Sequence, residues 1–106
     1  MESYKITERK EKNSQYYSAG MKEYCKKNWL KAIEYLEKSL NLEEKYYRTY
    51  FALGKCYSNI YKKKRAEELF KEVINLDKND AYARLELGKL YAEQGKDEEA
   101  EELFRE

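Results

Sequence analysis

Apolar residues recur along this chain at intervals of three and four, which is the spacing of one face of an α-helix. In the stretch "YYRTYFALGKCYSNI", Tyr50, Leu53 and Tyr57 follow this spacing. In "RAEELFKEVINL", a broader apolar stripe is made by Ala66, Leu69, Phe70, Val73, Ile74 and Leu76. The stretch "YKKK" between them is too polar and too short for anything but a turn. The pattern therefore predicts two helices joined by a turn, each burying one face.

This pattern returns along the chain after 34 residues. "LGKCY" at 53–57 is followed by "LGKLY" at 87–91, and Leu69 and Phe70 are followed by Leu103 and Phe104. Small residues keep the same interval, as Gly20, Gly54 and Gly88 do, and as Ala32, Ala66 and Ala100 do. A fixed period of this size indicates stacked repeats. Because small residues let two helices approach closely, we expect these glycines and alanines where helix backbones cross.

Composition supports helices with short connections, because the chain holds no proline and only four glycines. Its 22 lysines and arginines nearly balance 21 aspartates and glutamates, which gives no global attraction to nucleic acid or to an anionic membrane. We find no apolar run long enough for a membrane span. The start of the chain lacks the apolar stretch of a secretory signal, and two cysteines make no disulfide framework. These features favour a cytoplasmic protein.

Four features of the sequence resemble the tetratricopeptide repeat (TPR). They are the 34-residue period, the "LG..Y" segment, the alanine twelve residues after the glycine, and the aromatic residue or leucine four residues after that alanine. The stretch "AIEYLEKSLNLEE" is similar to the second half of that motif. The resemblance implies an all-α fold, a right-handed superhelix of stacked antiparallel helix pairs. It divides the chain into an N-terminal extension, able to continue the first helix, and a TPR domain: 1–12 and 13–106, with units 13–46, 47–80 and a partial 81–106.

The sequence departs from the family at the turns between paired helices, where the family favours glycine. Gly95 occupies this position in the third unit, but Lys27 and Tyr61 replace it in the first two. Either these residues adopt a positive φ, which is energetically unfavourable for residues other than glycine, or their turns have a different backbone conformation.

The resemblance also implies a concave groove, lined by the first helix of each pair, in which the family binds peptides or helices of partner proteins. Residues at the groove positions are Tyr17, Met21, Tyr24, Arg48, Phe51, Lys55, Asn59, Tyr82, Leu85 and Lys89. Aromatic side chains beside cationic ones are typical of recognition surfaces, and they suggest an acidic or aromatic peptide. Tyr17, Phe51 and Leu85 are also candidates for packing in the core.

The best-known clamp of this family holds paired terminal carboxylates with lysine, asparagine and arginine. The matching positions of this chain hold Tyr17, Met21, Ala52, Tyr82 and Glu86. None of these supplies the required cation or amide, and Glu86 would repel a carboxylate. We therefore expect a protein-interaction module that is not of the two-carboxylate-clamp type.

The sequence gives little evidence of a catalytic site, a cofactor site or a metal site. The chain has no histidine and no glycine-rich phosphate loop, and the spacing of its carboxylates and cysteines fits no metal site. Cys56 falls on a core-facing position, whereas Cys25 is expected to be exposed near the groove. The basic run 62–65 is too narrow for a nucleic-acid surface. We expect a protein that is not an enzyme and that has no cofactor.

An alternative function follows from the last predicted helix. Leu103 and Phe104 would lack a following helix to cover them, and covering each is worth about 1.5–3 kcal/mol. This end would then belong to a longer array or pair with another copy. The alternative is a self-association or scaffold module, a homo-oligomer that acts through its uncapped C-terminal end.

Overall fold

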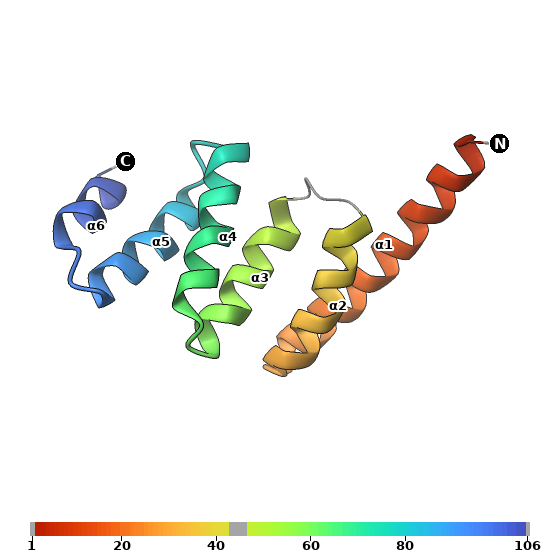
Figure 1. Ribbon diagram of the computed structural model, residues 1–106, viewed down its shortest axis with the longest axis horizontal. Helices are drawn as coiled ribbons and strands as arrows, with labels where there is room; N and C mark the ends of the chain where they lie inside the picture. Colours follow the sequence, from red (N-terminus) through yellow and green to blue (C-terminus); the bar gives the residue numbers. More distant parts are fainter. Residues whose placement is uncertain (1, 43–46, 106) are drawn as a thin grey trace.

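The computed structural model describes residues 2–42 and 47–105, with side chains from residue 8 onward. Over these ranges the chain forms six α-helices: α1 (Glu2–Cys25), α2 (Trp29–Leu42), α3 (Tyr47–Asn59), α4 (Lys63–Leu76), α5 (Ala81–Glu93) and α6 (Asp97–Phe104). They make three antiparallel pairs that follow one another along a long axis of 52 Å (Figure 1). Each helix packs mainly against its neighbours in the chain. The predicted all-α architecture is confirmed, and residues 2–12 lie within α1.

The turns within the three pairs share one hydrogen-bond pattern. In each turn, a backbone N–H donates to the carbonyl five residues earlier: Asn28 to Glu23, Lys62 to Tyr57 and Lys96 to Tyr91, at 2.8–2.9 Å. The residue before each donor has a positive φ: Lys27 at 63°, Tyr61 at 65° and Gly95 at 76°. This is the Schellman way of ending a helix. Lys27 and Tyr61 thus adopt the backbone conformation that favours glycine, which is the first of the two outcomes considered above.

Each glycine that recurs at the 34-residue interval leaves room for a large side chain from the second helix of its own pair. A Cβ atom on Gly54 would lie 2.7 Å from Phe70 Cε1, and one on Gly20 would lie 2.7 Å from Leu36 Cγ. These distances are well below van der Waals contact, so only glycine fits. We expected backbones to meet at these points; the atoms nearest to each glycine belong instead to a side chain of the second helix, and at Gly20 the backbone N of Leu36 lies 3.3 Å from the added Cβ as well. The reason is that Leu36 and Phe70 sit one helical turn beyond the buried alanine and point at the first helix.

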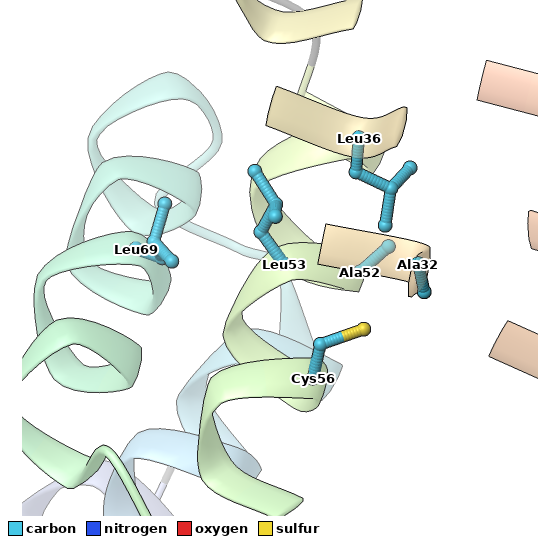
Figure 2. Packing of buried hydrophobic residues seen from close by; sticks show 6 residues of the cluster. All are labelled: Ala32, Leu36, Ala52, Leu53, Cys56 and Leu69. Carbon is cyan, nitrogen blue, oxygen red and sulfur yellow. The ribbon is translucent and has the colours of Figure 1, made fainter. Parts of the chain in front are cut away.

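The hydrophobic core runs along the stack as two clusters. The first is made by Ala32, Leu36, Ala52, Leu53, Cys56 and Leu69, and the second by Ala66, Phe70, Leu87 and Leu90. Figure 2 shows how the first cluster joins α2, α3 and α4, which belong to two different pairs. Because each cluster spans a boundary between pairs, burial of apolar surface holds neighbouring repeats together.

The two cysteines lie in opposite environments, as the sequence suggested. Cys25 is exposed at the end of α1, whereas Cys56 is fully buried and its Sγ points from α3 toward α2 (Figure 2). Burial raises the pKa of the Cys56 thiol to about 12. A thiol that stays protonated at neutral pH is a poor nucleophile, so Cys56 acts as a packing residue.

Replacing Gly54 by alanine is expected to destabilise the protein more than the same change at Gly88. Both added Cβ atoms would collide with a phenylalanine ring, but Phe70 is fully buried whereas Phe104 is 48% exposed and can swing away. Overpacking costs about 1–3 kcal/mol, and the better helix propensity of alanine offsets about 1 kcal/mol. Denaturant unfolding of Gly54→Ala and Gly88→Ala measures the difference. Equal losses would contradict the role given to the confined ring.

Stability is expected to fall at alkaline pH through Cys56. Its folded-state pKa is raised from 9.0 to about 12, so the contribution of the neutral thiol is complete below pH 9 and is lost as the pH rises toward 12. Unfolding free energies measured across this range should fall less steeply for Cys56→Ala than for the wild type. Cys25→Ala is the matched control and should leave the slope unchanged.

Candidate functional site

The first helices of the three pairs share one face, and a pocket of about 210 Å³ lies between them. Its walls come from α1, from the start of α3 and from the entry into α5. The lining residues are Tyr17, Met21, Tyr24, Tyr47, Arg48, Phe51, Ala52, Asp80 and Tyr82. The pocket therefore joins residues of all three repeats, and its shape depends on how the pairs stack.

The floor of this pocket is apolar and well supported. Tyr17, Met21 and Tyr24 follow the spacing of one face of α1, and all three pack against the first core cluster. Phe51 packs edge-on against the buried Phe70, with ring centroids 5.6 Å apart. Because these side chains are fixed by the core beneath them, a ligand group that enters meets a preformed surface.

Tyr24 contributes a neutral phenol to this floor. Its ring makes an edge contact with Trp29, with centroids 5.4 Å apart. Burial raises its pKa above the ordinary tyrosine value, with smaller contributions from Cys56 and Glu86. Tyr24 is therefore uncharged at neutral pH and offers a hydroxyl group without a negative charge.

The rim of the pocket is polar. Arg48 Nε donates to Tyr47 Oη at 3.5 Å, and its guanidinium lies 6.0 Å from the Tyr47 ring centroid. Asp80 caps α5, because its carboxylate accepts from the backbone N–H of Ala83 at 2.9 Å. Tyr82 follows on the first turn of α5 and is 75% exposed. An exposed aromatic ring, a guanidinium and a carboxylate thus surround the apolar floor.

A second polar cluster crosses from α3 to α5. Lys55 Nζ lies 3.1 Å from Glu86 Oε1, and Lys89 Nζ lies 3.7 Å from the same oxygen. Glu86 is largely buried, with 16% of its side chain exposed, so it holds both ammonium groups to the protein. The charge that Lys55 and Lys89 would offer to a ligand is reduced accordingly.

The structure brings together six of the ten residues proposed from sequence: Tyr17, Met21, Tyr24, Arg48, Phe51 and Tyr82 line the pocket. The other four lie outside it. Lys55 and Lys89 form the pair with Glu86, Asn59 Nδ2 donates to the carbonyl of Lys55 at 2.7 Å, and Leu85 is 43% exposed on α5. Of the residues that were also candidates for the core, Tyr17 and Phe51 pack against core clusters.

Sequence reasoning missed Tyr47 and Asp80 as pocket residues. Tyr47 stands four residues before Phe51 and so shares its helix face, which was a usable signal. Asp80 precedes the apolar pattern of α5, which marks it as a helix cap but not as a pocket residue. Four of the five positions that match the carboxylate clamp, namely Tyr17, Met21, Ala52 and Tyr82, line this pocket, and none of them is cationic.

A family model described as tetratricopeptide repeat matches residues 62–106. No curated protein matches the chain by sequence. The match therefore covers α4 to α6 and the single residue before α4, while the evidence for the earlier pairs comes from the fold.

Solved structures similar to this chain include three that carry the same fold over most of its length. The Arabidopsis OM64 TPR domain has a TM-score of 0.86 at 21% identity, covering 92% of this chain and 80% of that one. The second TPR of Spaghetti (RPAP3), bound to the HSP90 peptide SRMEEVD, has a TM-score of 0.84 at 20% identity, covering 93% and 94%. MamA has a TM-score of 0.84 at 24% identity and covers 88% of this chain, which spans 54% of the MamA chain.

Three lines of observation agree. The turns within the helix pairs repeat the same hydrogen bonds at intervals of 34 residues, the family model matches the last 45 residues, and TPR domains share the fold over about nine-tenths of the chain. The chain thus carries a tetratricopeptide repeat at residues 62–106, and over the remainder its stack of helix pairs has the fold of tetratricopeptide-repeat domains.

Proposed function

We propose that this protein binds a peptide segment of a partner protein in the pocket of α1, α3 and α5, and that a bulky apolar side chain of the peptide anchors it. The observation that carries the proposal is the apolar floor made by Tyr17, Met21, Tyr24 and Phe51. The similar TPR of Spaghetti (RPAP3) is bound to a peptide, which supports a protein-interaction role for this fold.

The size and chemistry of the pocket fit one anchor. A volume of about 210 Å³ holds an aromatic or a large aliphatic side chain, and burying such a group is worth about 1.5–3 kcal/mol. Arg48 at the rim favours an acidic residue near the anchor, and Tyr82 can close over the bound side chain. The proposed ligand is therefore a segment with an aromatic or aliphatic anchor beside an acidic residue.

Self-association through α6 is supported less well. Phe104 is 48% exposed, but its ring lies against Gly88 in the same way that the ring of Phe70 lies against Gly54. Its contact within its own helix pair already accounts for its position, so we favour the pocket.

Two substitutions at the rim are expected to weaken peptide binding without unfolding the protein. An array of peptides carrying aromatic and acidic residues identifies a binder, whose affinity is then measured by fluorescence anisotropy. Tyr82→Ala and Arg48→Glu should each reduce the affinity about tenfold or more, as hot-spot residues do. Both side chains are exposed, so folding should be retained.

The control is Leu76→Ala, because Leu76 is 44% exposed on α4 and is not among the residues that line the pocket. Lys55 is unsuitable for charge reversal, since a glutamate there would face Glu86. Array peptides with basic residues that bind as well as the acidic-aromatic ones, or rim variants that bind as the wild type does, would refute the proposed site.

The peptide SRMEEVD, which the similar TPR of Spaghetti (RPAP3) binds, is expected to bind this protein weakly or not at all. The clamp positions here offer tyrosine, methionine, alanine and glutamate, and an unpaired carboxylate buried against them is unfavourable. Titration of a labelled SRMEEVD peptide tests this, with a scrambled peptide as control. Saturable, sequence-dependent binding in the low micromolar range would show that the anchor is misassigned.

A further inference from the structure

The first two turns within helix pairs form an edge that is both apolar and basic. Figure 1 shows the α1–α2 and α3–α4 turns on the same side of the stack, opposite the α4–α5 turn. An open hollow of about 550 Å³ between them is lined by Asn28, Trp29, Leu30, Lys31 and Ile60. Leu30 is 72% exposed and Tyr61 is 84% exposed. We call residues 26–31 and 60–65 the turn edge.

The charge of the turn edge differs from that of the whole chain. Its first segment holds three cationic residues, its second holds four, and neither holds an acidic residue. Lys26, Lys63 and Arg65 lie within 4.0 Å of carboxylates. Within the described part of the chain, Lys27, Lys31, Lys62 and Lys64 have no carboxylate within that distance. The near-neutral total therefore hides a local excess of positive charge.

The third turn lacks both properties. It reads "QGKDEE" at 94–99, with one lysine, three acidic residues and no large apolar side chain. Its backbone has the same hydrogen bonds, so the fold itself does not require lysines and exposed apolar groups at such a turn.

Backbone conformation gives an independent reason to ascribe a role to these side chains. Lys27 and Tyr61 occupy the positive-φ position that Gly95 fills in the third turn. A side chain at such a position is strained, and strained residues that persist are found where the side chain is used. Packing of the Tyr61 side chain does not offset this backbone strain, because 84% of the residue is exposed.

We propose that the turn edge binds the surface of an anionic lipid bilayer, with Leu30 and Tyr61 entering the interface and the lysines contacting the headgroups. Leucine, tyrosine and tryptophan beside lysines are the side chains that favour this region of a membrane. No helix in the described part of the chain is both long and apolar enough to span a bilayer. Each lysine near such a surface contributes about fivefold in affinity.

A lipid surface fits this edge better than nucleic acid does. Leu30 and Ile60 supply aliphatic surface, which a bilayer can bury and a phosphate backbone cannot. This inference concerns a surface separate from the peptide pocket and does not rest on it.

Trp29 is the only tryptophan of the chain and lies on this edge, so its fluorescence reports binding directly. Vesicles of phosphatidylcholine with and without phosphatidylglycerol are mixed with the full chain and sedimented. We expect binding to the anionic vesicles only, a blue shift of the Trp29 emission, and release by salt.

Four variants make the test specific. Leu30→Ser should lower vesicle binding, and Lys62→Gln/Lys64→Gln should lower it about 25-fold. Tyr61→Gly should weaken binding while raising or preserving thermal stability, since it removes the strained residue. The matched pair Lys10→Gln/Lys78→Gln changes the net charge equally on exposed residues away from the edge and should bind as the wild type does.

Three outcomes would overturn the proposal: no sedimentation with anionic vesicles at low salt, an unchanged Trp29 emission, or equal losses in the edge pair and the control pair. Binding of a single-stranded oligonucleotide through the same lysines, without vesicle binding, would assign the edge to nucleic acid instead. Tyr82→Ala should leave vesicle binding intact, so failure here and failure of the peptide pocket remain distinguishable.

Discussion

The whole architecture depends on the contact between a glycine of each first helix and one large side chain of the helix that follows it. Gly20 receives Leu36, Gly54 receives Phe70 and Gly88 receives Phe104. This contact fixes how closely the paired helices approach, and the pair then presents its remaining apolar residues to the next pair. Without that fixed approach, the pocket between α1, α3 and α5 would have no defined shape.

Much of this fold could be predicted from the sequence, because its packing contacts recur at one interval. The 34-residue period located the helix pairs, and Gly95 pointed to the positive-φ position that Lys27 and Tyr61 also adopt. The partner of each glycine could not be predicted as readily. Periodicity shows which residues share a face, but whether a backbone or a side chain fills the facing space depends on the distance between helix axes.

The candidate site was less accessible to sequence reasoning, for two physical reasons. A charged residue on the groove face can form an ion pair with a neighbouring side chain, as Lys55 and Lys89 do with Glu86. Such pairing depends on the rotamers of the side chains. A residue outside the periodic pattern can still enter the site, as Asp80 does from its capping position. The basic run 62–65 was visible in the sequence, but that it lies beside the lysines of the first turn on one edge follows only from the stacking of the pairs.

The restriction of each helix to contacts with its sequence neighbours also bears on how this chain reaches its native state. Few residues separate the groups that must meet, so little chain entropy is lost before a favourable contact forms. Any of the three pairs can serve as a starting point, and growth proceeds by docking the adjacent one. Such topologies fold on the microsecond to millisecond scale, and a defect in one repeat spreads only as far as the next interface.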